Sequence, residues 1–220
     1  MTDTGALQKL LSWMSPAFPV GAFAYSAGFE TVIASGDVIR ASQVRDWIAG
    51  SLAAGSAHID AVLLAAAHGH ATSLADLTDI SGLCLALTGA RERREELVML
   101  GDSFVLAAAH WSKPMVEDLP AHCPYPVAVG AVAARHAIGL EEILLSFLTT
   151  VVQSQISVAV RLIPIGQSEG LDCLVALEPE IARRVPEIAA TKLEDIGGAG
   201  YGSEIAAMNH ERLHTRVFRS

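Results

Sequence analysis

Apolar residues recur at helical spacing along most of this chain, and proline or glycine ends each such stretch. The first stripe consists of Leu7, Leu10, Leu11 and Met14, which share one helical face and stop before Pro16. Nowhere is a β-branched run with alternating polarity long enough to predict a strand. Thirty-six of the 220 residues are alanine, which favours helices and is depleted in strands. The chain is therefore predicted to be all-α.

The same pattern predicts the other helices and the domain organisation. Helices are expected over 22–35, 42–67, 91–111, 127–138 and 141–162, with two short ones around Pro179 and Pro186 before residue 193. Ser73-Leu-Ala-Asp76 resembles a capping box that starts one more helix, and the four prolines of 114–126 indicate an ordered connector. We expect a single-domain bundle of about eight to ten helices over 1–202. A flexible glycine-rich hinge, 197–202, should precede a flexible C-terminal tail over 203–220 that binds a partner.

Charge is distributed unevenly between the body and the C-terminal end. The formal net charge is −9, but 209–220 holds three arginines and one glutamate (+2), which leaves −11 for the rest. An acidic body gives no general attraction to nucleic acid or to an anionic membrane. The uncharged run 143–160 is interrupted by Ser, Thr and Gln, so we expect a buried helix rather than a membrane span. Three widely spaced cysteines fit a reducing compartment, and a cytoplasmic location is predicted.

One catalytic motif occurs in the tail. His210-Glu-Arg-Leu-His214 matches the H-E-x-x-H helix in which two histidines bind zinc and the glutamate is the general base. The six residues that follow hold no third metal ligand, and a chain end offers little rigid support. We therefore expect no metal site, no cofactor and no catalytic residues. A helical zinc hydrolase that uses this motif is the alternative.

Two segments are better suited to recognition than to chemistry. In the tail, Leu213, Val217 and Phe218 alternate with arginines, and arginine and aromatic residues are enriched at interfaces. Arg161-Leu-Ile-Pro-Ile-Gly-Gln167 ends a buried helix with a charge and an amide. The run Arg91-Glu-Arg-Arg-Glu-Glu96 alternates in sign, which is typical of a solvated helix face.

Four blocks of the sequence resemble the UreF family of urease accessory proteins. They are Ser15-Pro-Ala-Phe-Pro-Val-Gly-Ala-Phe-Ala-Tyr-Ser-Ala-Gly-Phe-Glu30, Arg91-Glu-Arg-Arg, Arg161-Leu-Ile-Pro-Ile-Gly-Gln-Ser-Glu-Gly170 and His210-Glu-Arg-Leu-His-Thr-Arg-Val-Phe-Arg-Ser220. The first is similar to the family pattern S-P-x-x-P-V-G-x-F-x-x-S-x-G-L-E, and the resemblance covers almost the whole chain. His214 stands where the family commonly has tyrosine, so the second histidine of the zinc motif looks incidental.

The resemblance implies a non-catalytic, all-helical chaperone that works as a homodimer. Such proteins bind UreD (also called UreH) and recruit the GTPase UreG to apo-urease, which supports lysine carbamylation and nickel insertion. The family also suggests control of GTP hydrolysis by UreG.

Ten residues are our candidates for partner binding. In the tail we expect His210, Glu211, Leu213, Arg216, Phe218 and Arg219 to dock on UreD. Tyr25 and Glu30 are expected to be exposed at a rigid proline-cornered interface, and Arg161 and Gln167 complete the set.

Overall fold

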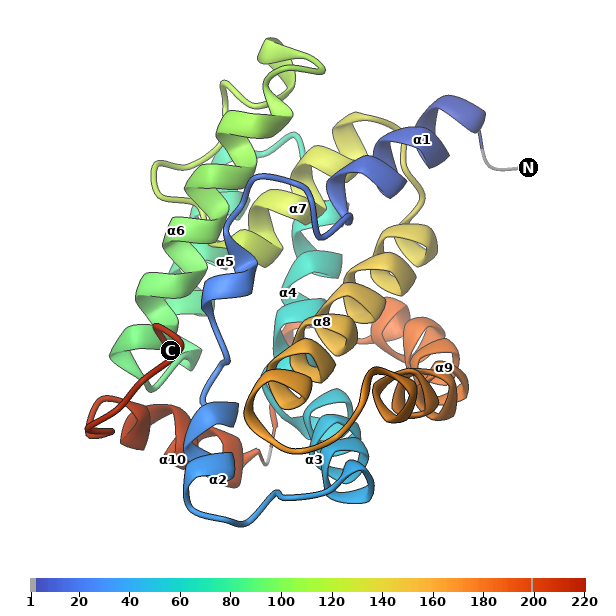
Figure 1. Cartoon of the computed structure of the whole chain (residues 1–220). Helices are drawn as coiled ribbons and strands as arrows, with labels where there is room; N and C mark the ends of the chain where they lie inside the picture. The colour runs from blue at the N-terminus through green and yellow to red at the C-terminus, as the bar shows by residue number, and fades with distance from the viewer. Residues whose placement is uncertain (1–2, 199) are drawn as a thin grey trace.

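Helices make up most of this protein, as a computed structural model that describes residues 3–198 and 200–220 shows (Figure 1). The α-helices are α1 (Thr4–Trp13), α2 (Phe29–Ala34), α3 (Ala41–Ala54), α4 (Ser56–Gly69), α5 (Leu74–Leu87), α6 (Arg91–Ala108), α7 (Tyr125–Arg135), α8 (Leu140–Leu162), α9 (Gln167–Ala190) and α10 (Tyr201–His210). Three 3₁₀ turns are η1 (Ala22–Ala24), η2 (Lys113–Met115) and η3 (Leu193–Asp195). No strand occurs within the described ranges, and the all-α prediction is confirmed.

The core is centred on α4, which packs against α3, α5, α7, α8 and α9. In Figure 1 this helix runs through the middle of the bundle. Every residue of α7 from Pro126 to Ala133 is buried, and most are small. A Cβ atom built on Gly130 would lie 2.2 Å from the carbonyl oxygen of Leu64, so only glycine permits this close approach of α7 to α4.

Long apolar helices surround this centre. Both α8 and the stretch Ala41–Gly69 are long and apolar enough to cross a membrane by length and composition alone. In α8, however, Ile143, Leu144, Phe147, Leu148 and Val152 are all buried in the bundle. Core packing therefore accounts for this apolar run, as we expected for 143–160. Thr150 Oγ1 also donates a 3.1 Å hydrogen bond to the carbonyl oxygen of Met14, which ties α8 to the end of α1.

The prediction of one continuous helix over 22–35 is wrong. Instead, η1 and α2 are separated by a turn in which Ala27 (φ 52°) and Gly28 (φ 81°) have left-handed backbone conformations. A helix cannot pass through two such residues. Gly28 is required for a second reason, because its Cβ would lie 2.6 Å from the backbone nitrogen of Ala207 in α10.

Two other helix predictions also need correction. The expected helix 42–67 is divided at Gly55, whose ψ of −158° separates α3 from α4. Conversely, the two short helices expected around Pro179 and Pro186 form one helix, α9. A stripe of Cys173, Leu177, Ile181, Val185 and Ile188 is buried along α9. The free energy gained by burying this stripe outweighs the cost of the two backbone hydrogen bonds that the prolines cannot donate.

The structure also tests the predicted start of α5 and the predicted hinge at 197–202. Ser73 caps α5 by accepting a 3.2 Å hydrogen bond from the Asp76 backbone nitrogen, as the capping box predicts. The hinge expected over 197–202 is partly helical, since α10 begins at Tyr201; Ala199 lies outside the described residues. The boundary expected between 202 and 203 therefore falls inside α10.

Candidate interaction site

The C-terminal segment 211–220 lies against its own body and does not extend into solvent. In Figure 1 it returns from α10 to the first turns of α6. The backbone nitrogen of Ser26 donates a 2.8 Å hydrogen bond to the carbonyl oxygen of Ser220, and that of Arg219 donates one of 2.8 Å to Ala24. Ser26 Oγ also donates to the Ser220 carbonyl oxygen. These bonds join the C-terminal end of the chain to the loop at residues 24–26, so the expected flexible tail is corrected to a docked one.

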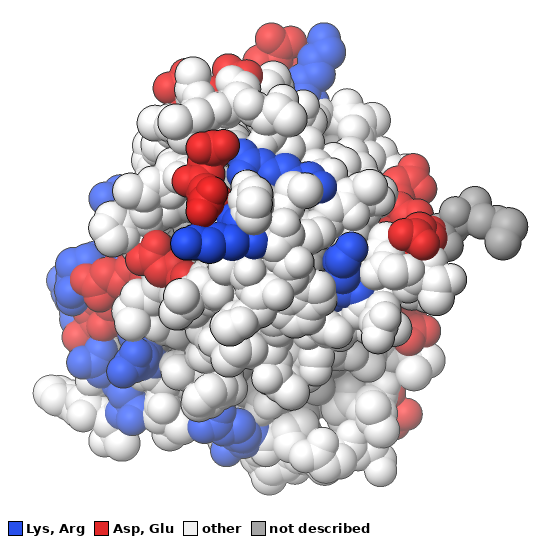
Figure 2. All heavy atoms as spheres, turned by 90° about the horizontal axis from the view of Figure 1, so that it is seen from above, with Lys and Arg blue, Asp and Glu red and all other residues white. Residues whose placement is uncertain are grey.

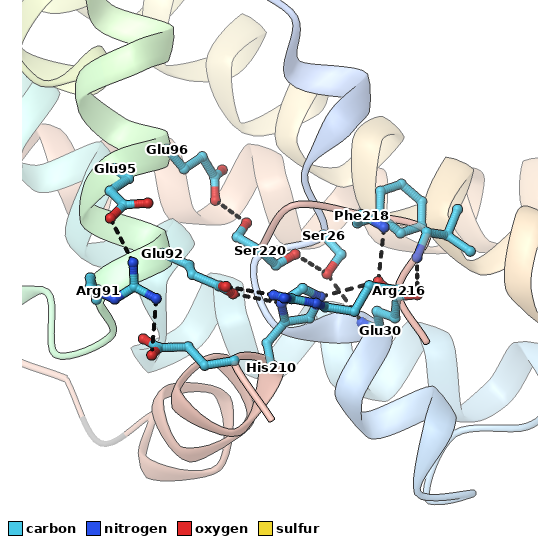
Figure 3. Close-up of polar contacts among 12 residues, drawn as sticks. Ser26, Glu30, Arg91, Glu92, Glu95, Glu96, His210, Arg216, Phe218 and Ser220 are labelled. Carbon is cyan, nitrogen blue, oxygen red and sulfur yellow. Dashed lines mark hydrogen bonds and ion pairs between the residues drawn. The ribbon is translucent and has the colours of Figure 1, made fainter. Parts of the chain in front are cut away.

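The carboxylate of Glu30 in α2 holds the backbone of this segment. It accepts hydrogen bonds from the backbone nitrogens of Val217 (2.7 Å) and Phe218 (3.0 Å). The side chain of His210 reaches the same carboxylate, with Nε2 3.1 Å from Oε2. We expected Glu30 to be exposed, but it is only 5% exposed. The reason is that a buried carboxylate here satisfies three groups that would otherwise lack partners (Figure 3).

On the other side of His210 from Glu30, helix α6 contributes Glu92. Glu92 Oε2 lies 2.7 Å from His210 Nδ1, and Glu92 Oε1 accepts a 2.7 Å bond from Arg216 Nη1. His210 is 0% exposed and lies between α2 and α6. One turn further along α6, Glu96 accepts a 2.6 Å bond from Ser220 Oγ (Figure 3).

A buried ion pair extends the network into the core. Arg93 is bonded to both Glu96 and Asp60 of α4. Burial raises the pKa of Asp60 to about 6, even though the neighbouring guanidinium opposes this shift. For Arg93, burial disfavours the charge, but attraction to Glu96 and Asp60 outweighs it and raises the pKa of the guanidinium. These three side chains line a cavity of about 90 Å³.

Phe218 is the main apolar contact of the docked segment. Its side chain is buried, and the guanidinium carbon of Arg161 lies 4.4 Å from the ring centroid. Arg161 Nη1 also donates a 3.2 Å bond to the carbonyl oxygen of Phe23. Arg161 therefore links the docked segment to the N-terminal loop. A cation–π contact at a partly exposed site contributes about 0.5–1 kcal/mol to stability.

The ten predicted site residues divide into buried and exposed groups. Tyr25 and Glu30 are buried, which corrects the expectation that both are exposed, and His210 and Phe218, which we expected to dock on UreD, are buried as well. Tyr25 Oη donates to Met99 Sδ of α6 at 3.5 Å. Glu211, Arg216, Arg219, Arg161 and Gln167 are exposed, and Leu213 is half-buried. Arg161 and Gln167 line one shallow groove beside Leu171, so they do lie together.

Several residues of this site were not singled out by the sequence. The alternating charges of the run 91–96 predict a solvated face, but Glu92, Arg93 and Glu96 point inward while Arg91 and Glu95 stay at the surface. Asp60 was also missed. Its isolated position among apolar residues of α4 is a signal that could have identified it, because a lone acid in a core helix needs a buried partner.

The zinc motif does not form a metal site in this arrangement. Helix α10 ends at His210, so Glu211 and His214 lie beyond the helix and the required helical face is absent. Both ring nitrogens of His210 already face carboxylates. Within the described ranges there is no group of three residues that could hold a metal ion. The zinc hydrolase alternative receives no support.

The fold and the site together define an all-α protein whose C-terminal segment is held by a buried charge network. Comparison with known proteins then gives the family. The family model UreF matches residues 38–178. Over 215 residues the chain is 45% identical to the urease accessory protein UreF of Rhizobium etli, covering 98% of this chain and 96% of that protein. It is 43% identical to UreF of Sinorhizobium medicae over 218 residues (99% and 98%) and 40% identical to UreF 1 of Brucella anthropi over 220 residues (100% and 96%). The chain belongs to the UreF family, and the resemblance seen in the sequence is confirmed.

Proposed function

We propose that this chain is a non-catalytic chaperone of urease maturation, which bridges UreD and the GTPase UreG on apo-urease. Membership of the UreF family supports the coarse role, since the similar proteins are named urease accessory proteins. The finer role is supported by one surface. The exposed residues Phe23 (77%), Val217 (56%), Arg161 and Arg219 lie on segments that are hydrogen-bonded to one another. We call these four residues the tail face.

The geometry of the tail face favours protein binding. The carbonyl oxygen of Phe23 accepts a hydrogen bond from Arg161, and the backbone nitrogen of Arg219 donates one to Ala24, so the segments that carry the apolar and cationic residues are held together. Exposed apolar groups flanked by arginine are typical of the centre of a protein interface. Because the segment is already ordered, a partner does not bear the cost of ordering it. UreD is the partner that we assign to this face.

The charged surface is consistent with a protein partner rather than with nucleic acid. The formal net charge of the whole chain is −9, and on the one face seen from above, acidic and basic side chains are mixed around a broad uncharged area (Figure 2). A nucleic-acid-binding face would instead gather Lys and Arg in one patch. The proposal therefore includes no nucleic acid and no membrane, and it places the protein in the cytoplasm as a homodimer.

Co-purification of tagged chain with UreD, UreG and urease tests this function. Val217→Glu and Arg219→Glu change only outward side chains of the tail face, so we expect folding to be kept and UreD recovery to fall at least about tenfold. Lys113→Glu is the control, because Lys113 is exposed near the opposite end of α6 from the docked segment. Recovery of UreD at the wild-type level with both tail-face variants would contradict the proposed contact.

Two further measurements test the remaining parts of the proposal. Light scattering of the purified chain should give the mass of a dimer, and GTP hydrolysis by UreG should change when the chain and UreD are added together. A monomer that still activates urease would exclude the dimer. An unchanged rate of GTP hydrolysis would limit the role to that of a scaffold.

A further inference from the structure

The ring of His210 has an unusual position for a buried histidine, because both of its nitrogens face a carboxylate. Nδ1 lies 2.7 Å from Glu92 Oε2, and Nε2 lies 3.1 Å from Glu30 Oε2. A neutral imidazole carries one N–H, so it can donate to only one of the two carboxylates. The lone pair of the other nitrogen would then point at an acceptor oxygen. Only the doubly protonated ring donates to both, and such charge-assisted bonds are the strong ones.

The charges that face the ring lead to the same conclusion. Glu30 from α2 and Glu92 from α6 contribute two negative charges, and Arg216 from the docked segment contributes one positive charge. A protonated His210 balances this cluster. Without that proton the cluster holds an excess negative charge around a ring that is 0% exposed. An uncompensated charge in such a place is strongly destabilising. The neighbouring Glu96 has its own partners, Arg93 and Ser220.

The same two carboxylates also hold the docked segment. Glu30 accepts the backbone N–H groups of Val217 and Phe218, and Glu92 accepts Arg216. The side chains of His210, Glu30 and Glu92 therefore link α10, α2, α6 and segment 211–220 in one arrangement (Figure 3). We propose that His210 is a proton-dependent latch, which in its doubly protonated form closes segment 211–220 onto the body and releases it when the proton is lost.

The direction of the pH dependence follows from this geometry. The proton is part of the closed state, so the closed state binds more protons than the open one and rising pH favours opening. Opening would carry Val217 and Arg219 away from Phe23 and so dismantle the tail face. The latch itself belongs to this chain alone, and its test needs no partner.

Amide hydrogen exchange on the full chain tests the latch. The readout is the protection factor of the Val217 and Phe218 amides, which divides out the intrinsic effect of pH on exchange. In the wild type we expect this factor to fall at least about tenfold between about pH 5.5 and about pH 8.5. His214→Gln is the matched control, because His214 lies in the same segment but is exposed, and its profile should equal that of the wild type.

His210→Gln should give low protection at these two amides at every pH. Protection factors that stay within about twofold across this pH range in the wild type would overturn the latch, as would a loss of pH dependence in His214→Gln. If His210→Gln does not fold, the ¹⁵N chemical shifts of the His210 ring in the wild type decide the question. Both ring nitrogens should show imidazolium shifts at about pH 5.5, and a neutral tautomer there would refute the proposal.

Discussion

At the scale of single residues, this protein places an unusual number of charged groups out of solvent. Glu30, Glu92, Glu96 and Asp60 are each less than 10% exposed, and each has a basic partner at hydrogen-bond distance. A buried pair of this kind adds little net stability, but breaking it is costly because the remaining charge is left uncompensated. The network is therefore better understood as a device that specifies one position for the C-terminal segment.

Asp60 gives a prediction with a defined sign. Its pKa is raised from 3.8 to about 6 by burial, so the folded state binds the proton more tightly than the unfolded state. The resulting stabilisation is fully present below about pH 4 and is lost as the pH rises through about 6. Removing the carboxyl in Asp60→Asn removes this contribution. We compare the unfolding free energy of the wild type with that of Asp60→Asn. The value for the wild type should fall by about 2 kcal/mol relative to the value for the variant between about pH 4.5 and about pH 7.5.

Urea unfolding at several pH values measures this difference. Asp79→Asn is a suitable control, because Asp79 is an exposed residue on α5 and does not belong to the buried charge network. A difference for Asp60→Asn that stays constant, or that grows with pH, would show that burial does not dominate at this site.

At the scale of elements, the site depends on how closely the helices approach one another. Helix α2 has only six residues, and it meets α10 through Gly28, where no side chain would fit. Helix α6 presents Glu92, Arg93 and Glu96 to the body from its first two turns. The central pair α4 and α7 sets the position of the other helices, and Gly130 is the residue that allows their contact.

Two glycine substitutions separate helix packing from helix propensity. In Gly130→Ala the new Cβ would meet the Leu64 carbonyl oxygen at 2.2 Å, so α7 must shift and we expect a loss of about 2 kcal/mol or more. In Gly82→Ala, within α5, the new methyl group meets nothing within 4 Å. Alanine should there stabilise the protein by about 0.5–1 kcal/mol through its helix propensity.

Thermal or urea unfolding of the two glycine variants distinguishes these effects. If Gly130→Ala were as stable as the wild type, then α4 and α7 would not be packed as closely as the structure shows.

At the scale of the whole molecule, the docked segment closes the chain on itself. Residues 24–26 and 219–220 are almost 200 positions apart, yet their backbones are hydrogen-bonded. The segment covers Glu30, Glu92 and Glu96, so each of these carboxylates loses one of its hydrogen-bond partners if it leaves. Deletion of the tail would consequently affect folding as well as partner binding, which is why outward point variants are the cleaner functional test.

Adjacent residues of the docked segment should differ sharply in their effect on stability. Phe218 is 4% exposed and Val217 is 56% exposed. Phe218→Ala removes a buried ring and its Arg161 contact, and we expect a loss of about 2–4 kcal/mol in unfolding free energy. Val217→Ala should change this free energy by less than about 0.5 kcal/mol. Equal effects of the two substitutions on urea unfolding would contradict a docked segment.

Much of the helical layout follows from local sequence. The proline after α1, the Ser73 cap of α5 and the apolar stripe of α8 each act within a few residues, so a linear reading locates them. The errors have a common cause. Helix α9 continues past Pro179 and Pro186 because a long apolar stripe is buried along it. The left-handed turn at Gly28 forms where the chain packs closely against α10. Both depend on partners that are distant in sequence.

The sequence by itself determined the fold class, the helical periodicity and the family, because these reside in local patterns and in contiguous blocks of residues. It also singled out Glu30, His210 and the tail arginines as a set of interest. Only the tertiary structure decided what these groups do. Whether a charged side chain faces water or a partner depends on which helices cross near it, and Glu92 and Glu95 differ in this respect although they belong to the same charged run. The electrostatic free energy of a charge is set by its surroundings in space, and these include residues that lie far away along the chain.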